Sequence, residues 1–294
     1  MKKTPVAIIG TGNIGTDLLI KIQRSSILEC VLFTGRRLDS RGMQRARLLG
    51  VPISDQSIKA IQRNHNICDI VFDATSAKAH QYHAPILKKL GKIAIDLTPS
   101  KVGKMCIPVI NMNQCLDENN VNLVTCGGQA AIPIAHAIMR VHPETEYIEV
   151  VASIASKSAG LGTRDNIDEF TQTTGDAILN FTGVPRAKAI IILNPAEPPV
   201  LMHNTIYAQI TKPKIKKMTA AINDIVNKVQ KYVPGYKVTV GPVAEGNRVT
   251  VMIEVVGLGD FLPKYSGNLD IITCAAVNIA ESFAQKKIRG KVPL

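Results

Sequence analysis

The stretch Val6-Ala-Ile-Ile-Gly10-Thr-Gly12-Asn-Ile-Gly15 joins a short apolar run to the start of a helical pattern. This is a Gly-x-Gly-x-x-Gly arrangement in the strand–turn–helix setting that dinucleotide-binding folds require. The glycines permit a tight turn, a close approach of backbone to pyrophosphate, and close packing of the helix on the strand. The stretch predicts a Rossmann domain at the N-terminus. An ordinary glycine-rich turn is the alternative.

Apolar runs of strand length alternate with helical segments through the first third of the chain. Residues 29–33 read as the second strand, and residues 69–74 and 92–97 are continuous apolar runs with a helical pattern at 80–90 between them. Such runs are typical of strands buried on both faces of a parallel sheet. The alternation predicts an α/β fold with a doubly wound parallel sheet.

The pattern changes at Tyr147. The strand-like segments are 147–154, 188–193, 204–209, 236–243 and 248–256, and the helical ones are 163–181, 215–231 and 271–287. This arrangement is typical of an α+β domain with a mostly antiparallel sheet. We expect a dinucleotide-binding Rossmann domain over residues 1–128 and 266–294, with the last helix returning to it, and an α+β substrate domain over residues 129–265.

The composition argues against several classes of function. The net charge is +12, but basic residues are dispersed and aromatic residues make up only 4%, so no nucleic-acid partner is expected. A phosphate-rich ligand and a lysine-biased surface both explain the charge. No apolar run approaches the roughly 20 residues that span a bilayer, so no membrane association is expected. The six cysteines lack zinc-site spacing, which predicts no metal and a cytoplasmic protein.

The end of the second strand departs from the usual Rossmann pattern. An acidic residue that binds the ribose hydroxyls is expected there, and this chain has Phe33-Thr-Gly-Arg36-Arg37. Arginine in this place can pair with a 2′-phosphate. The hypothesis is that Arg36 and Arg37 allow NADP to bind at least as well as NAD. The alternative is that both arginines are solvated and other groups hold the ribose.

The stretch Val121-Asn-Leu-Val-Thr-Cys126-Gly-Gly-Gln-Ala-Ala-Ile-Pro133 places one cysteine at the mouth of a helix, just after a short apolar strand. Unpaired backbone N–H groups and the helix dipole favour a thiolate there, which predicts a lowered pKa for Cys126. Gly127 and Gly128 would leave the sulfur unobstructed, and Pro133 suits a first helical turn. Together with the glycine turn, Cys126 predicts covalent thiol chemistry coupled to hydride transfer.

Two further segments resemble ligand-binding loops. Residues 73–77 end a buried strand, where an open parallel sheet meets its ligand. Residues 156–165 follow the first strand of the second domain, with Lys157 and Arg164 suited to phosphate or carboxylate. The alternative for the second segment is a connection that caps the next helix at Thr163.

Several stretches spread over nearly the whole length resemble one family. They are Ala7-Ile-Ile-Gly-Thr-Gly-Asn-Ile-Gly-Thr-Asp17, Val71-Phe-Asp-Ala-Thr-Ser-Ala77, Ala94-Ile-Asp-Leu-Thr-Pro99, the Cys126 stretch, Val150-Val-Ala-Ser-Ile-Ala-Ser-Lys-Ser-Ala-Gly160, Thr163-Arg-Asp-Asn-Ile-Asp-Glu-Phe170, Leu193-Asn-Pro-Ala-Glu-Pro-Pro199 and Ser266-Gly-Asn-Leu-Asp-Ile271. In these stretches the chain is similar to the CoA-acylating acetaldehyde dehydrogenases, the partners of 4-hydroxy-2-oxovalerate aldolase in meta-cleavage pathways.

The resemblance implies a Rossmann domain, a second domain that carries the contacts of a homodimer, and Cys126 as the acyl-thioester nucleophile. It implies NAD or NADP as cofactor, CoA and a short aldehyde as substrates, and an aldolase as a partner. The implied cofactor contacts are Thr11, Gly12, Asn13, Ile14, Lys157, Ser158, Ala159, Gly160, Leu161, Gly162, Thr163, Arg164, Asp165 and Asn268. From its neighbours alone, Asn268 is equally a turn residue before the last helix.

Two positions depart from the family pattern. Relatives commonly have an aspartate near Arg37, and an Asp-Thr pair where this chain has Asn204-Thr205. The family's aspartate is thought to help activate the thiol or CoA. Asparagine can orient a group by hydrogen bonding but cannot take a proton near neutral pH. His203 is adjacent to Asn204, but neighbours on a strand face opposite ways.

The expected reaction forms a thiohemiacetal on Cys126, transfers hydride to nicotinamide, and passes the acyl group from the enzyme to CoA. One alternative is a phosphorylating semialdehyde dehydrogenase, which would use phosphate as the acyl acceptor. A second alternative is a non-catalytic nucleotide-binding subunit of an aldolase complex, because the family's aspartate is absent at Asn204.

Overall fold

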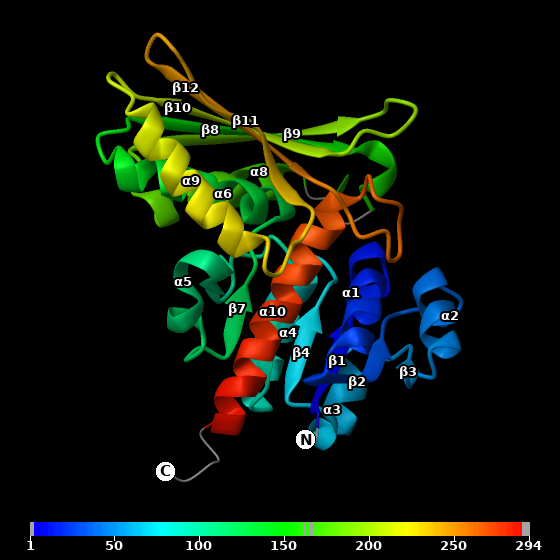
Figure 1. Ribbon diagram of the computed structural model, residues 1–294. Coiled ribbons are helices and arrows are strands. Elements are labelled where there is room, and N and C mark those ends of the chain that lie inside the picture. The colour runs from blue at the N-terminus through cyan, green and yellow to red at the C-terminus, as the bar shows by residue number, and fades with distance from the viewer. Residues whose placement is uncertain (1–2, 161–162, 165–166, 290–294) are drawn as a thin grey trace. The chain divides into compact units, whose positions relative to one another are not determined.

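The computed structural model describes residues 3–160, 163–164 and 167–289, with side chains described up to residue 287. The chain divides into two compact units. Unit 1 comprises Met1–Leu123 and Thr273–Leu294, and unit 2 comprises Val124–Ile272. Each unit is described by itself (Figure 1).

Unit 1 is built on a parallel sheet. Its strands are β1 (Thr4–Ile9), β2 (Leu28–Thr34), β3 (Ile53–Ser54), β4 (Ile70–Asp73), β5 (Ile93–Asp96), β6 (Lys104–Met105) and β7 (Asn120–Asn122). Its helices are α1 (Asn13–Arg24), α2 (Arg41–Leu48), α3 (Ile58–Arg63), η1 (His65–Ile67), α4 (Ala77–Lys89), α5 (Pro108–Cys115) and most of α10 (Gly267–Arg289). The strand order is β3-β2-β1-β4-β5-β7-β6, and every pairing is parallel. The doubly wound parallel sheet predicted from sequence is confirmed.

The strand order changes direction beside β1. The chain runs outward through β2 and β3 on one side and returns to β4 and β5 on the other. Ligands of open α/β sheets bind at the carboxyl ends of the strands at such a reversal. The site of unit 1 is therefore expected where β1 and β4 end, at Gly10 and Ala74.

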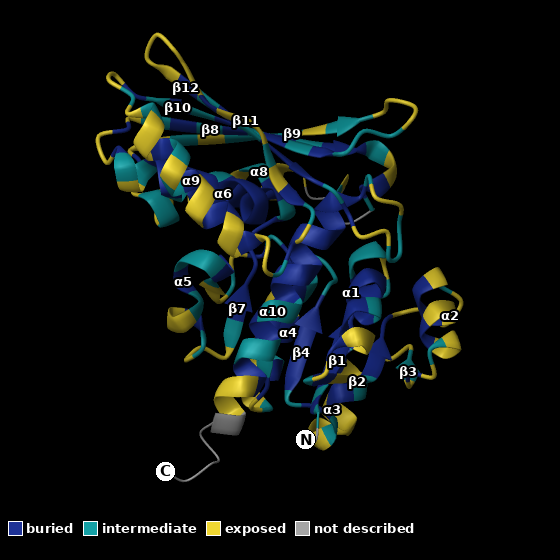
Figure 2. Cartoon of the chain, viewed as in Figure 1, coloured by how far each residue is buried: buried dark blue, intermediate teal, exposed yellow. Residues whose placement is uncertain are grey.

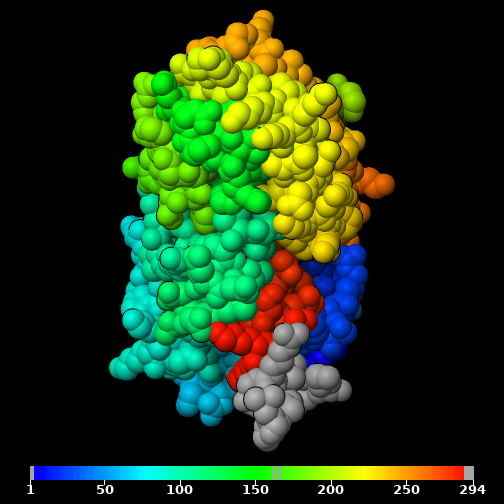
Figure 3. Space-filling model, turned by 60° about the vertical axis from the view of Figure 1, so that its left-hand side comes forward, coloured from blue at the N-terminus to red at the C-terminus, as the bar shows by residue number. Residues whose placement is uncertain are grey.

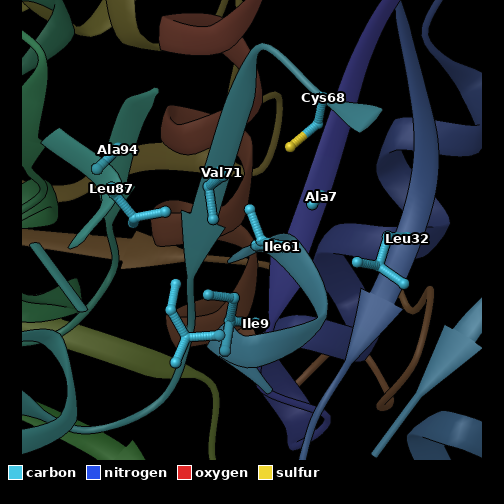
Figure 4. Packing of buried hydrophobic residues seen from close by; sticks show 9 residues of the cluster. Ala7, Ile9, Leu32, Ile61, Cys68, Val71, Leu87 and Ala94 are labelled. Carbon is cyan, nitrogen blue, oxygen red and sulfur yellow. The ribbon is translucent and has the colours of Figure 1, made fainter. Parts of the chain in front are cut away.

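Helices cover both faces of this sheet. On one face, Ala7, Ile9 and Val71 pack with Ile61 of α3 and Leu87 of α4, as Figure 4 shows. On the other face, an added Cβ at Gly15 of α1 would touch Ile8. Both faces of β1 and β4 are thus buried, which explains their unbroken apolar sequences.

The last helix, α10, lies at the surface of unit 1 beside the segment that follows α5 (Figure 3). Lys286 Nζ is 2.5 Å from Asp117 Oδ1. On its other side, Thr273 donates a hydrogen bond to the buried carboxylate of Asp17 in α1. These contacts attach the C-terminal helix to α1 and to the segment after α5.

Unit 2 contains a mixed sheet with the order β11-β12-β10-β8-β9. Its elements are α6 (Cys126–Val141), β8 (Tyr147–Ala155), η2 (Ser156–Ser158), α8 (Ile167–Thr182), β9 (Arg186–Asn194), β10 (Met202–Gln209), α9 (Ile215–Val229), β11 (Tyr236–Glu245) and β12 (Arg248–Val255). Among the strands of unit 2 that the structure describes, β8 and β9 are the one parallel pair. The mostly antiparallel sheet predicted for this part of the chain is confirmed.

The three long helices of unit 2 lie on one face of its sheet (Figure 1). Burial alternates along β10 (Figure 2), and Asn204, one of its buried residues, donates a hydrogen bond to Gly127 of α6 on the helix side. Among the described residues of unit 2, no helix covers the other face. One row across that open face consists of Ile190, Val151, Thr205 and Met252, which the strand registers place side by side.

Candidate active site

In the glycine turn of unit 1, an added Cβ would have different surroundings at each of the three glycines. Gly10 has φ +111°, and a Cβ there would lie 2.4 Å from the carbonyl oxygen of Ala74. A Cβ at Gly15 would lie 1.9 Å from the carbonyl oxygen of Gly10, so α1 can approach β1 only because residue 15 has no side chain. At Gly12 an added Cβ would meet nothing within 4 Å. The turn is packed on two sides and open at Gly12.

The N-terminus of α1 is suited to an anion. Gly12 is its N-cap, no side chain caps it, and its first turn has no acidic residue. The first N–H groups of a helix need partners from outside it, and a phosphate is a good acceptor. Thr11, Gly12, Asn13 and Ile14, the predicted cofactor contacts, are consecutive residues at this helix start. The described residues here fit a dinucleotide pyrophosphate.

The segment after β2 lies against Thr11. Ser40 Oγ donates to Thr11 Oγ1 over 3.1 Å, and a Cβ at Gly42 would lie 2.4 Å from the carbonyl oxygen of Thr11. Of the two arginines singled out above, Arg37 forms two hydrogen bonds with Asp39, at 3.0 and 2.7 Å. Arg36 is exposed and is the one whose guanidinium is not engaged by Asp39.

Cys126 is the first residue of α6. Its N-cap, Thr125, accepts a hydrogen bond from Gly128 N–H at 2.9 Å, and the Thr125 hydroxyl contacts that of Thr174 at 2.7 Å. Two residues earlier, Val124 has φ +63°. A β-branched residue rarely adopts this left-handed conformation, and such strain often accompanies functional sites. The chain thus turns sharply just before the cysteine, a feature that no residue pattern indicated.

The thiol of Cys126 does not have the lowered pKa that the sequence predicts. Burial raises its pKa to about 12, although the backbone N–H groups of Gly127 and of Cys126 itself lower it. The helix-terminus effect is therefore present, but the burial of the thiol outweighs it. The predicted lowering of the pKa was wrong because local sequence does not reveal how deeply the thiol is buried.

The glycines after Cys126 serve the packing of α6. A Cβ at Gly127 would lie 2.8 Å from the ring of Phe170, and one at Gly128 would lie 2.8 Å from Val124. Their small size is needed for these contacts. Pro133 does not lie in the first turn of its helix, because α6 begins at Cys126 and runs through Pro133.

Asn204 of β10 reaches the residue after the cysteine. Its side chain is 1% exposed, and Nδ2 donates to the carbonyl oxygen of Gly127 over 3.0 Å. Asn204 Oδ1 is buried and accepts no hydrogen bond within the described part of the chain. His203 faces the other way, as predicted, with Nε2 2.9 Å from Glu254. The structure brings Asn204, and not His203, to the start of α6.

The loop after β8 forms hydrogen bonds within itself and an ion pair with the segment after β9. Arg164 donates to the carbonyl oxygen of Ser156 over 2.7 Å, and Lys157 Nζ is 2.5 Å from Glu197. Ser158 and Ala159 are buried, while Gly160 accepts from the N–H groups of Thr163 and Arg164. Three predicted contacts, Leu161, Gly162 and Asp165, lie outside the described residues.

Asn268 is the second residue of α10. The helix begins at Gly267, four residues earlier than the pattern predicted, so Asn268 is helical and not a turn residue. Its side chain is 5% exposed. Its Oδ1 is buried and accepts no hydrogen bond from any residue that the structure describes.

The described residues hold no cluster of metal-ligating side chains and no helix suited to span a membrane. No group of three or more His, Cys, Asp or Glu side chains there has a geometry that could hold a metal ion. In the same part of the chain, no helix combines the length and apolar character needed to cross a bilayer.

Comparisons with known proteins match the N-terminal and the C-terminal parts of the chain to two different family models. Residues 5–114 match the family described as semialdehyde dehydrogenase, NAD binding domain, and residues 126–263 match prokaryotic acetaldehyde dehydrogenase, dimerisation. In fold, the chain is similar to aspartate semialdehyde dehydrogenase II from Vibrio cholerae, with a TM-score of 0.67 at 12% identity over 99% of this chain and 100% of that one.

Relatives of much higher identity match over the whole length. An acetaldehyde dehydrogenase of Pectobacterium atrosepticum is 55% identical over 96% of both chains, and one of Geobacillus stearothermophilus is 54% identical over 99% of both. One of Spirochaeta aurantia is 53% identical over 97% of this chain and 96% of its own. The resemblance drawn from the sequence is confirmed, and the chain belongs to the acetaldehyde dehydrogenase family.

Proposed function

We propose that this protein is an acylating aldehyde dehydrogenase, which converts a short aldehyde, by default acetaldehyde, with CoA and NAD(P) to acyl-CoA and NAD(P)H. The observation that carries the proposal is Cys126 at the N-terminus of α6, with Gly127 and Cys126 N–H groups directed at its sulfur. The family of the chain supports the same reaction.

In the proposed reaction, the Cys126 thiolate attacks the aldehyde carbonyl carbon, and a C–S bond forms as the carbonyl oxygen becomes an oxyanion. Backbone N–H groups at the start of α6 stabilise that charge. A bound nicotinamide supplies the acceptor for the hydride that leaves as the C–H bond breaks. The thioester left on Cys126 is then attacked by the CoA thiol, which releases acyl-CoA and returns the cysteine.

Asn204 is proposed as a positioning residue. An amide cannot take the thiol proton near neutral pH, so its contribution is the hydrogen bond from Nδ2 to the Gly127 carbonyl oxygen. This bond fixes the Gly127–Gly128 peptide, the second after Cys126, and so helps to hold the start of α6 in place. The base that removes the thiol proton is not assigned to Asn204.

We propose that NADP is accepted as well as NAD, with Arg36 as the contact for the 2′-phosphate. Arg37 is paired with Asp39, and Arg36 is exposed next to Gly35, where an added Cβ would lie 2.7 Å from the Thr11 side chain. Arg36→Ala is expected to lower kcat/KM for NADP about tenfold and to leave that for NAD within twofold. The matched control, Arg37→Ala, should change neither value. Equal loss for both cofactors in Arg36→Ala would contradict the assignment.

A homodimer through the open sheet face of unit 2 is the proposed assembly. That face carries the row Ile190, Val151, Thr205 and Met252, and Ile192 beside it is 44% exposed. The dimerisation family matched by residues 126–263 supports it. Ile192→Asp should shift the mass in sedimentation from dimer to monomer, whereas Leu179→Asp, on α8 of the helix layer, should not.

The remaining assignments rest on the resemblance and on chemistry. The six cysteines are all free thiols, which fits a reducing cytoplasm. A 4-hydroxy-2-oxovalerate aldolase is the proposed partner, and co-purification from cells that express both chains tests it.

The function itself is tested by exchanging the acyl acceptor. Aldehyde-dependent reduction of NAD(P) that requires CoA supports the proposal. Reduction that requires phosphate would instead identify a phosphorylating semialdehyde dehydrogenase. A folded protein that binds NADH and turns over nothing would fit a non-catalytic subunit.

A further inference from the structure

A buried cluster of charged side chains in unit 1 has no part in the reaction described above. β4 and β5 are neighbours that end in Asp73 and Asp96, and these two residues are paired directly across the strands. Neither side chain is exposed to solvent. Two carboxylates so close in an apolar sheet repel each other unless a positive group lies between them.

His80 of α4 lies between the two carboxylates. Its Nδ1 is 2.9 Å from Asp73 Oδ2, and its Nε2 is 3.6 Å from Asp96 Oδ2. Nδ1 is therefore within hydrogen-bond distance of one carboxylate and Nε2 lies near a second, an arrangement whose two negative charges suit an imidazolium. The ring is fully buried, so water cannot replace either contact.

The amide of Asn120 gives independent support for the second proton. As placed, its Nδ2 is 3.1 Å from His80 Nε2, while its Oδ1 is buried without a hydrogen bond among the described residues. The two ends of an amide are interchangeable by a half-turn, and that turn would direct Oδ1 at an Nε2–H. A protonated His80 thus supplies a partner for Asn120 Oδ1, which has none among the described residues.

The carboxylates of Asp73 and Asp96 favour the protonated state of His80. Burial opposes it, but the hydrogen bond to Asp73 and the charge of Asp96 outweigh burial and raise the pKa of His80. Burial also raises the pKa of Asp96, to about 6. The other titratable contact is His83 of the same helix, whose Nδ1 is 2.8 Å from Asp73 Oδ2, and the β7 neighbours Asn120 and Asn122 are neutral.

The same carboxylates hold the loops beside the glycine turn. Asp73 Oδ1 accepts from the N–H and hydroxyl of Thr75, and Asp96 accepts from Thr98 N–H and the Ser100 hydroxyl. The loop after β4 lies directly against Gly10, where a Cβ would touch the Ala74 carbonyl oxygen. A change of charge at His80 is therefore expected to shift the loop after β4, which lies between Asp73 and the dinucleotide turn.

We propose that His80 is a positioning residue that carries two protons in the working protein, bridges Asp73 and Asp96, and so holds the loop after β4 against the dinucleotide turn. Loss of its second proton then weakens dinucleotide binding. This inference rests on the proposed function only in naming a dinucleotide as the ligand. The bridge itself is made of residues of this chain and does not depend on that function.

The experiment uses the full chain and two readouts. The first is the pH midpoint of the His80 ring, followed by NMR on protein with labelled histidine and without ligand, with His80→Asn to assign the signal. The second is the Kd of NADH over the same pH range. The bridge predicts a midpoint above the ordinary value of about 6.5. Above that midpoint the Kd should rise by up to tenfold per pH unit.

Two isosteric variants change the negative charge near His80 Nε2, one by removing a carboxylate and one by adding a carboxylate. Asp96→Asn removes the carboxylate facing Nε2 and should lower both the ring midpoint and the pH at which NADH binding weakens. Asn120→Asp adds a carboxylate there and should raise both. His83→Asn is the matched control, because His83 contacts Asp73 but not Asp96, and it should shift the midpoint less than Asp96→Asn does.

Three results would overturn the proposal. They are a His80 ring that is neutral at pH 7, a midpoint that neither Asp96→Asn nor Asn120→Asp moves, and an NADH Kd that stays flat while the ring titrates. Failure of NADH to bind at every pH would refute the dinucleotide assignment itself. The ring midpoint, read without ligand, distinguishes that failure from the absence of the bridge.

Discussion

Gly15 and Gly12 belong to the same glycine turn, and alanine is predicted to lower stability at residue 15 but to weaken NADH binding at residue 12. A Cβ at residue 15 would lie 1.9 Å from the Gly10 carbonyl oxygen, whereas close carbon–oxygen contacts are normally about 3.3 Å. Helix α1 must therefore move away from β1 by about 1.4 Å. The obstructing atom is backbone, so no side chain can rotate to make room.

Overpacking of this kind costs about 1–3 kcal/mol, and the upper end is expected because the clash is with a buried strand. Gly15→Ala should then lower the Tm by about 6–12 °C. At Gly12, which has φ −79° and open space around it, Gly12→Ala should change stability by less than about 1 kcal/mol. Its methyl group would occupy the space above the start of α1, and the Kd of NADH should rise at least tenfold.

Thermal unfolding followed by circular dichroism, and NADH titration by calorimetry, separate the two effects. A Tm of Gly15→Ala within 2 °C of the wild type would refute the packing argument. Undiminished NADH binding by Gly12→Ala would show that the pyrophosphate does not lie over this helix.

Three further substitutions test other parts of the account. Cys126→Ser should abolish CoA-dependent turnover and leave the Kd of NADH within twofold; residual turnover above background would exclude the nucleophile assignment. Asn204→Ala removes the donor to Gly127 and should lower kcat about tenfold with NADH affinity unchanged, so an unaltered kcat contradicts its positioning role. Burial opposes ionisation of Asp73, but hydrogen bonds from His80 and His83 lower its pKa from 3.8 to about 2. Its charge therefore stabilises the fold by about 2 kcal/mol above pH 4, and this is lost as the pH falls through 3.8 towards 2. Asp73→Asn should be less stable than the wild type by about that amount in urea unfolding at pH 7 and equal to it near pH 2; equal stability at pH 7 would contradict the argument.

The fold was largely predictable because its signals are local. Unbroken apolar runs such as 69–74 mark strands buried on both faces, and alternation marks the sheet of unit 2. The turn between β11 and β12 was predictable from Gly246, which has φ +60°. Element boundaries were less so: α6 begins at Cys126, ahead of Pro133, since a proline within a helix looks in sequence like one at its start.

The residues assigned to the site stay a prediction that rests on local patterns, and the electrostatics of the site had no such pattern. Cys126 and the glycine turn carry local patterns, whereas the pKa of the thiol depends on burial by segments distant in sequence. The pairing of Arg37 with Asp39 likewise has no pattern of its own. The buried His80 bridge was missed because it joins residues from three elements. Its one sequence signal is an aspartate at the end of each buried strand, Asp73 and Asp96.

The most direct test of the central claim mixes purified protein with acetaldehyde and either NAD or NADP, with and without CoA, and follows the near-ultraviolet absorbance of the reduced cofactor. The account predicts a signal that grows only when CoA is present, with both cofactors, and that Cys126→Ser does not give. A signal independent of CoA, or none from folded protein that binds NADH, would contradict it.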